Sequence, residues 1–146
     1  MILVDANLLI YAIDRGSPHH SAARSWWNEQ LSKVDTVGLA WAVILSVVRI
    51  TTNPRIVLRP LTTEDVMREV ESWLAQPCVK IFHPGDGHWG IFRDLLKPVS
   101  FRPNLVMDVH LAALAIEHGG ELCSADEDFK KFPGLSWSNS LKPTNA

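Results

Sequence analysis

The chain has 146 residues, of which 47% are hydrophobic and 21% charged, and its formal net charge at pH 7 is −2. This length fits one ordinary domain, and the composition excludes a disordered or fibrous chain. The charge excludes a global basic field, so a nucleic-acid partner would need a local basic patch or bound cations. Two cysteines, Cys78 and Cys123, are too few for a disulfide framework and predict reduced, core-filling thiols.

Neither a targeting sequence nor a membrane span is evident in the sequence. The first 13 residues are apolar, but Asp5 interrupts them and no basic region precedes them. The longest apolar run, residues 37–48, is shorter than the ~20 residues that a membrane helix needs. We therefore expect a soluble, cytoplasmic protein without membrane contact.

Short apolar runs alternate along the chain with longer segments of helical periodicity. Strands are predicted, in chain order, at residues 1–4, 36–39, 79–82 and 121–124. Helices are predicted at residues 8–14, 19–31, 40–51, 62–75, 88–96 and 104–118, with a short helical turn after Asp126. This alternation predicts an α/β fold with a central, mostly parallel sheet flanked by helices. Residues 1–140 would form one domain, and residues 141–146 a loose tail.

Three aspartates occupy positions at which α/β proteins place functional side chains. Active sites of open α/β sheets gather beyond the carboxyl ends of the strands. Asp5 directly follows the first predicted strand, and Asp126 follows the last one. Asp108 lies one turn into the predicted helix 104–118, in an otherwise apolar stretch. We therefore predict that these three carboxylates form one cluster.

Such a cluster favours a hard divalent cation. Clustered carboxylates repel each other, and Mg²⁺ or Mn²⁺ relieves that repulsion because both ions prefer oxygen ligands. The ion can activate a water molecule and neutralise charge that develops on a phosphate. The sequence therefore predicts a metal-dependent hydrolase of phosphodiesters, with Asp5, Asp108 and Asp126 as its metal ligands and catalytic residues.

Each aspartate also has a purely structural interpretation. Asp5 would cap the helix after the first strand, and Asp126 or Asp128 would cap turns in a surface loop. Asp108 would lie on a solvated edge of its helix. Only the joint placement of these residues favours the metal site.

Arginines without neighbouring acids form a second feature of the sequence. The segment 36–63 contains Arg49, Arg55 and Arg59 and no acidic residue. Arginine binds phosphate oxygens through paired N–H donors, so this segment is predicted to contact a nucleic-acid backbone. Arg49 and Arg55 are the predicted substrate-binding residues. Taken singly, each arginine is better explained as an ordinary surface residue.

Four motifs in one order resemble PIN-domain proteins. Residues 2–12, Ile-Leu-Val-Asp-Ala-Asn-Leu-Leu-Ile-Tyr-Ala, resemble the opening of that family, and residues 104–119 resemble its central acidic helix. Residues 124–135 resemble its closing motif. Trp41, together with Arg-Ile-Thr-Thr-Asn-Pro-Arg at residues 49–55, is similar to a subgroup of VapC toxins. The resemblance covers nearly the whole chain.

The resemblance implies a PIN fold and a Mg²⁺- or Mn²⁺-dependent endoribonuclease that is the toxin of a type II toxin–antitoxin pair. Its partners would be an RNA substrate, a cognate VapB antitoxin and a second copy of the chain in a homodimer. Asp5 and Asp108 would hold the metal, and Asp126 would complete the acidic cluster. Asn7 and Ser124 would give polar support.

One position departs from the family pattern. Ser46 stands where many PIN domains have a glutamate, and no other acid occurs between Asp35 and Glu64. The metal site would then have one carboxylate fewer, with Asp128 as an additional candidate ligand. This departure leaves open a PIN-like module that binds a protein partner without catalysis.

A second alternative is a phosphatase of the haloacid dehalogenase type, which also uses an aspartate after its first strand. That class normally has another aspartate two residues later, where this chain has Asn7. The sequence contains neither a GxSxG motif nor a glycine-rich phosphate loop, and His88 and His110 are not at a metal-binding spacing. The ribonuclease interpretation is preferred.

Overall fold

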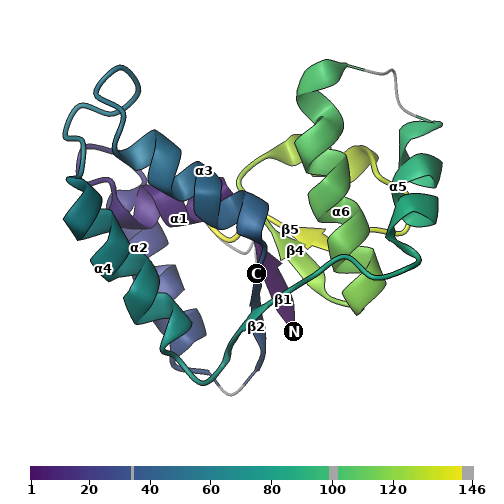
Figure 1. The fold of residues 1–146 in the computed structure, drawn as a ribbon, viewed down its shortest axis with the longest axis horizontal. Coiled ribbons are helices and arrows are strands. Elements are labelled where there is room, and N and C mark those ends of the chain that lie inside the picture. Colours follow the sequence, from purple (N-terminus) through teal and green to yellow (C-terminus); the bar gives the residue numbers. More distant parts are fainter. Residues whose placement is uncertain (34, 99–101, 143–146) are drawn as a thin grey trace.

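Within the described residues, 1–33, 35–98 and 102–142, the computed structural model has a central sheet of five short parallel strands (Figure 1). The strands are β1 (Ile2–Val4), β2 (Val37–Leu39), β3 (Val79–Ile81), β4 (Glu121–Cys123) and β5 (Trp137–Ser138). Their order in the sheet is β3-β2-β1-β4-β5, and each neighbouring pair is parallel. The predicted α/β fold with a mostly parallel sheet is confirmed.

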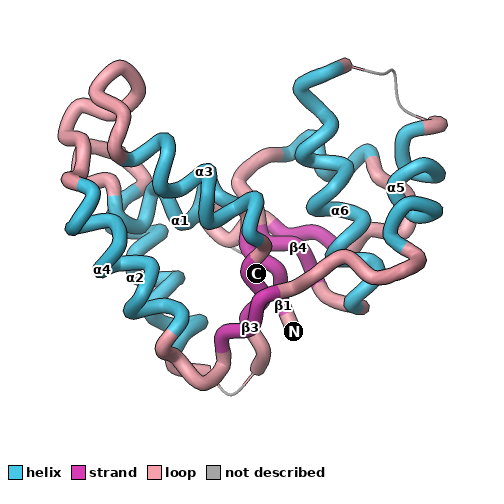
Figure 2. Tube along the Cα trace, in the orientation of Figure 1, coloured by secondary structure: helices cyan, strands magenta, loops and turns pink. Residues whose placement is uncertain are grey.

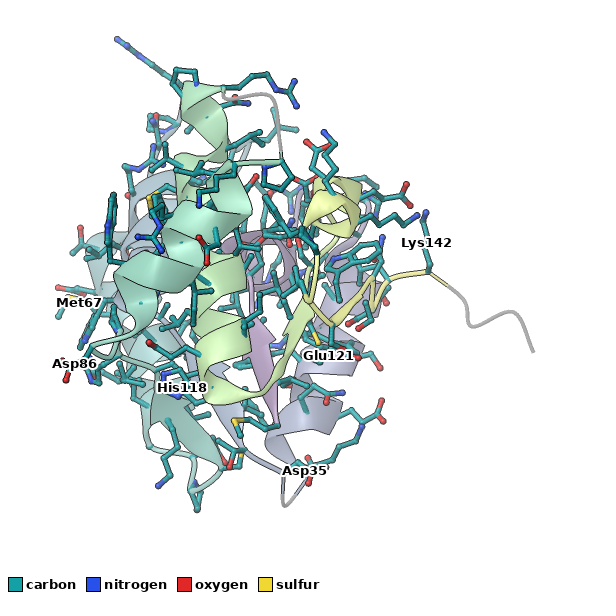
Figure 3. All side chains as sticks on the ribbon, turned by 90° about the vertical axis from the view of Figure 1, so that its right-hand side faces the viewer. Asp35, Met67, Asp86, His118, Glu121 and Lys142 are labelled. Carbon is teal, nitrogen blue, oxygen red and sulfur yellow. The ribbon has the colours of Figure 1, made fainter. Side chains whose placement is uncertain are left out.

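Helices lie on both sides of this sheet. They are α1 (Ala6–Ile13), α2 (His20–Leu31), α3 (Trp41–Thr51), α4 (Thr63–Leu74), α5 (His88–Leu96) and α6 (Val106–His118), with 3₁₀ turns η1 (Pro103–Leu105) and η2 (Glu127–Lys131). Helices α1 to α4 form one group, α5 and α6 form another, and the strands run between them (Figure 2). Figure 3 views the molecule from the side of α5 and α6, with His118 labelled at the end of α6.

Local sequence signals set several of these boundaries. The side chain of Thr62 accepts a hydrogen bond of 3.1 Å from the backbone N–H of Asp65 and caps α4. Gly119 ends α6 with a φ of 69°, a conformation that glycine adopts without strain. The first turn of the predicted helix 104–118 is instead the 3₁₀ turn η1, so α6 begins at Val106. The two-residue strand β5 was not predicted, because so short an edge strand has no periodicity to reveal it.

An apolar core joins the two groups of helices to the sheet. Trp27 of α2 and Trp73 of α4 are buried and pack edge to face, with ring centroids 5.6 Å apart. Gly38 of β2 is required by Phe82, because a Cβ atom at this position would lie 2.4 Å from the phenyl ring. These contacts pack α2 against α4 and place the ring of Phe82 against β2.

Both cysteines are free thiols; Cys123 is buried, as predicted, whereas Cys78 is only half-buried. In the described part of the chain, every helix is too short or too polar to cross a lipid bilayer. The predicted tail begins at Leu141, which packs against the core, and its residues 143–146 lie outside the described residues.

Candidate active site

Asp5 and Ser124 meet where two neighbouring strands end. β1 and β4 pair in parallel at the point where the strand order reverses, which is where open α/β sheets place their binding sites. Asp5 caps α1: its Oδ1 accepts a hydrogen bond of 2.7 Å from the backbone N–H of Ala6. Its Oδ2 accepts a hydrogen bond of 2.8 Å from the hydroxyl of Ser124. Both carboxylate oxygens are therefore held in place.

The environment of Asp5 opposes its ionisation. Burial raises the pKa of this carboxyl, and repulsion from Asp126 adds to the rise. The hydrogen bonds from Ser124 and Ala6 lower the pKa but do not offset the burial. A cation beside Asp5 would stabilise its charged form.

Ser124 also positions the loop that carries Asp126. Its hydroxyl oxygen accepts hydrogen bonds from the side-chain amide of Asn7 at 3.1 Å and from the backbone N–H of Asp126 at 3.0 Å. The amide oxygen of Asn7 accepts from the backbone N–H of Ala125 at 3.3 Å. Asp126 in turn caps η2 through the backbone N–H of Asp128, at 2.9 Å. The structure thus brings Asn7 and Ser124 together with Asp5 and Asp126.

Asp108 faces these residues from the first turn of α6. It is half-buried, and its pKa is raised to about 6, first by burial and then by repulsion from Asp5, Asp126 and Asp128. The charges of Asp5, Asp126 and Asp128 therefore all act on the carboxyl of Asp108. The structural interpretations also hold in part, because Asp5 and Asp126 are helix caps as well as members of the cluster.

A cavity of about 300 Å³ opens in front of this cluster. Residues of α1, α3 and α6 surround it, with Asp5 at the start of α1: Asp5, Ala6, Asn7, Ile10, Ala42, Val43, Ser46, Arg49, Ile50, Met107, Asp108 and Leu111. The hydroxyl of Ser46 donates to the carbonyl of Ala42 at 2.9 Å, so at this position the cavity wall carries no negative charge. The apolar members of the wall were not predicted, because they share the periodicity of ordinary core residues.

The structure separates the two predicted substrate-binding arginines. Arg49 of α3 lines the cavity together with Asp5 and Asp108. Arg55 is exposed in the turn after α3 and is not among the described residues that line this cavity. Its backbone N–H donates a hydrogen bond of 2.9 Å to the side-chain oxygen of Asn53, which fixes that turn.

The donor chemistry of the cavity fits a hard divalent cation. Among the described residues, no three Asp, Glu, His or Cys side chains are arranged to bind one ion together. Mg²⁺ does not require this, because it is usually bound through one or two carboxylates and retains several waters. Asp5 and Asp108 would supply the carboxylates; burial raises the pKa of Asp108 most, and neighbouring negative charge, which a cation would neutralise, raises it further.

A histidine contact that the sequence did not suggest lies between α5 and α6. Nε2 of His88 and Nδ1 of His110 are 2.9 Å apart. On the other side of His88, Nδ1 lies 3.7 Å from a carboxylate oxygen of Glu117, which accepts a 2.7 Å hydrogen bond from the backbone N–H of Gly85. None of these residues lines the cavity in front of Asp5. Because His88 belongs to α5 and His110 to α6, their contact joins these two helices.

Comparison with known proteins agrees with this fold. The sequence model of the PIN domain matches residues 2–135. Ribonuclease VapC37 of Mycobacterium tuberculosis is 41% identical over 137 residues, which cover 94% of this chain and 95% of the relative. Ribonuclease VapC33 of the same organism is 37% identical, and the match covers 97% of this chain and 99% of the relative.

The fold also matches a solved structure, VapBC2 from Rickettsia felis bound to a DNA fragment from their promoter. The TM-score is 0.69 at 20% identity, and the match covers 95% of this chain and 98% of the solved chain. This likeness concerns the fold alone. The chain belongs to the PIN domain family, and within it to the VapC proteins.

Proposed function

We propose that the chain is a metal-dependent endoribonuclease and the toxin of a VapBC-type toxin–antitoxin pair. The observation that carries this proposal is that Asp5, at the carboxyl end of β1, and Asp108, in the first turn of α6, line one cavity, while the charge of Asp126 raises the pKa of both carboxyls. The relatives VapC37 and VapC33, which match nearly the whole chain, are both named ribonucleases.

Asp5 and Asp108 are the proposed ligands of Mg²⁺ or Mn²⁺, and Asp126 would hold a second ion or orient the attacking water. When bound, the metal lowers the pKa of water and neutralises charge on the phosphate. Ser124 and Asn7 fix the carboxylate of Asp5 and the loop of Asp126, so little reorganisation is needed when substrate binds. Asp128 acts mainly through its negative charge, which raises the pKa of Asp108.

Arg49 is the proposed contact for a phosphate next to the cleaved bond, because it lies on the wall that Asp5 and Asp108 share. Arg55 is further along the same acid-free segment and contacts the RNA backbone outside the cavity. Phosphate contacts of this kind position a nucleic acid without reading its sequence.

The proposed partners are an RNA substrate, a VapB-type antitoxin and a second copy of the chain. Exposed apolar side chains on α3 and α5 support a protein contact: Trp41 is 50% exposed, Leu45 64% and Trp89 67%. Trp41 and Leu45 are four residues apart on α3 and so share one face of the helix. A homodimer through these helices, in the cytoplasm, completes the proposal.

A binding module without catalysis is the second candidate, and Ser46 is the observation that favours it. With serine at this position, the cavity has one carboxylate fewer than in many PIN domains. The hydroxyl of Ser46 donates its hydrogen bond to the carbonyl of Ala42 in the same helix. A phosphatase is less compatible with the site, because Asn7 hydrogen-bonds to Ser124 and Ala125 at the position where a second aspartate would act.

Inducible expression in a bacterial host tests the proposal. We expect wild-type expression to arrest growth and to produce discrete RNA fragments, whereas the Asp108→Asn variant at equal abundance does neither. Co-expression of the small open reading frame that precedes the gene should restore growth. Equal arrest by wild type and Asp108→Asn, without RNA fragments, would favour the binding module.

A further inference from the structure

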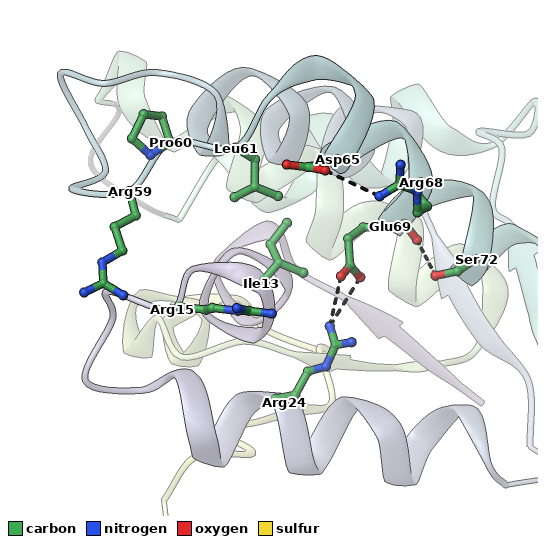
Figure 4. A pocket seen from close by; sticks show the side chains of 10 residues that line it. All are labelled: Ile13, Arg15, Arg24, Arg59, Pro60, Leu61, Asp65, Arg68, Glu69 and Ser72. Carbon is green, nitrogen blue, oxygen red and sulfur yellow. Dashed lines mark hydrogen bonds and ion pairs between the residues drawn. The ribbon is translucent and has the colours of Figure 1, made fainter.

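A second cavity lies at the opposite end of α1 from Asp5 (Figure 4). Its volume is about 540 Å³, and Ile13, the last residue of α1, forms part of its wall. Because an α-helix rises 1.5 Å per residue, the axis of α1 separates Asp5 from this wall by roughly 12 Å. Helices α2 and α4 and the segment between α3 and α4 complete the cavity.

Four arginines and two acids give this cavity a net positive charge: Arg15, Arg24, Arg59, Arg68, Asp65 and Glu69. Both acids already have an arginine partner. Arg24 lies 3.2 Å from a carboxylate oxygen of Glu69, and Arg68 lies 3.5 Å from one of Asp65. The two positive charges that are left belong to the guanidinium groups of Arg15 and Arg59.

Arg15 and Arg59 have no hydrogen-bond or ion-pair partner for their side chains among the described residues (Figure 4). They come from two turns that pack together, since a Cβ atom built on Gly16 would lie 3.7 Å from Cβ of Leu58. Both side chains are exposed, and their unpaired charges make the cavity attractive to a polyanion that passes over it. Guanidinium groups bind phosphate oxygens in paired hydrogen bonds.

The acid-free segment 36–63 contributes an arginine to each of the two cavities. Arg49 lines the cavity in front of Asp5, Arg55 lies in the turn after α3, and Arg59 lines the second cavity. Residues 36–63 contain no acid that would repel a polyanion along this segment. Arg49, Arg55 and Arg59 thus follow one another along the segment that runs from the first cavity to the second.

We propose that Arg15 and Arg59 form a second phosphate-binding site, which holds the RNA backbone at a distance from the cleaved bond. This inference rests on the proposed ribonuclease function and extends it, because it gives the enzyme a preference for substrates long enough to reach both cavities. The contact is to phosphates and is therefore independent of base sequence.

Binding of fluorescein-labelled oligouridylates of about 4 and about 16 nucleotides tests this site, since single-strand binding sites vary over that range. All proteins carry Asp108→Asn to prevent cleavage. The test variant adds Arg15→Gln and Arg59→Gln. The matched control adds Lys33→Gln and Arg93→Gln, which remove the same charge from two exposed basic residues that already have acidic partners and do not line this cavity.

We expect the test variant to bind the 16-mer about tenfold more weakly at 0.1 M salt and the 4-mer unchanged, with the matched control like its parent. The slope of log affinity against log salt should fall by about 1.4, because each contact to single-stranded RNA contributes ~0.7. A 16-mer that binds no tighter than the 4-mer, or equal affinities of test variant and control, would overturn the proposal. So would loss of antitoxin binding in the test variant with RNA binding intact.

Cleavage assays of proteins that keep Asp108 distinguish failure of the second phosphate-binding site from failure of the proposed ribonuclease function. If wild type cleaves RNA only with a divalent metal and Arg15→Gln/Arg59→Gln cleaves long and short RNA equally well, the ribonuclease stands and the second site falls. If wild type does not cleave RNA, the proposed function itself fails.

Discussion

The hydroxyl of Ser124 donates a hydrogen bond of 2.8 Å to Oδ2 of Asp5, across 119 positions in the sequence. Parallel pairing of β1 with β4 places the two residues at adjacent strand ends. The same hydroxyl oxygen accepts from Asn7 and from the backbone of Asp126. One buried side chain therefore orients a carboxylate and also fixes the loop that carries another.

Replacement of Ser124 by alanine should lower both stability and metal affinity. The variant leaves an oxygen of Asp5, the amide of Asn7 and the N–H of Asp126 without their partner, which costs about 1–3 kcal/mol for a buried group. Urea unfolding with chelator measures the first effect, and Mn²⁺ titration calorimetry the second. Ser25→Ala, at an exposed position on α2, is the control. Unchanged Mn²⁺ affinity in Ser124→Ala would contradict a positioning role.

Asp108→Asn should stabilise the metal-free protein above pH 6. The pKa of Asp108 is raised from 3.8 to about 6, so the folded state binds its proton more tightly than the unfolded state does. Stability is therefore lost as the pH rises from about 4 to about 6, and the loss is complete above pH 6. Asparagine does not ionise and avoids this loss, which we place at about 1 kcal/mol because solvent screens a half-exposed carboxyl.

Urea unfolding in EDTA between pH 4 and pH 8 measures this difference. The curves of wild type and Asp108→Asn should converge near pH 4 and separate as the pH rises. A variant less stable than wild type at pH 7.5, without metal, would show that Asp108 is not under electrostatic repulsion in the folded protein.

Removal of divalent metal should destabilise wild type and leave Asp108→Asn unaffected. A ligand that binds only the folded state adds about 2.7 kcal/mol at 100 times its Kd. Protons compete with the metal at Asp108, so the gain in Tm should shrink as the pH falls through about 6. Thermal unfolding with Mg²⁺, Mn²⁺ or EDTA at pH 5 and pH 7.5 tests both statements. Equal shifts in Tm for both proteins would place the ion elsewhere.

Ser46→Glu should raise metal affinity at a cost in metal-free stability. The new carboxylate would enter the cavity that Asp5 and Asp108 line, where it adds an oxygen ligand and also repulsion. Calorimetry should show a lower Kd for Mn²⁺, and urea unfolding with chelator a lower stability. Ser46→Ala, which loses only a hydrogen bond within α3, should match wild type in metal affinity. A Kd unchanged by Ser46→Glu would mean that this wall does not face the ion.

Sequence patterns predicted the parts of this molecule that depend on local chemistry. Apolar runs identified four of the strands, and the predicted helices 62–75 and 104–118 end close to the caps Thr62 and Gly119 that the structure shows. Asp5 and Asp126 were identifiable because each follows a strand. The strand β5 escaped because its pairing with β4 is a tertiary contact of only two residues.

Contacts between distant segments were less accessible to sequence reasoning. Arg49 and Arg55 looked equivalent in the sequence, yet α3 directs only Arg49 to the cavity in front of Asp5. His88 and His110 are 22 positions apart and gave no spacing signal, but the packing of α5 on α6 brings their rings together. Arg15 and Arg59 line the same cavity only because the two turns that carry them pack together.

Cleavage of mixed transfer and ribosomal RNA by purified protein tests the ribonuclease most directly. The reactions contain Mg²⁺, Mn²⁺ or EDTA, with Asp108→Asn alongside and circular dichroism to establish that both proteins are folded. A metal-dependent enzyme built on these carboxylates gives discrete products that disappear with EDTA and with Asp108→Asn. Folded wild type that yields no products with either metal, or Asp108→Asn that cleaves as well as wild type, would contradict it.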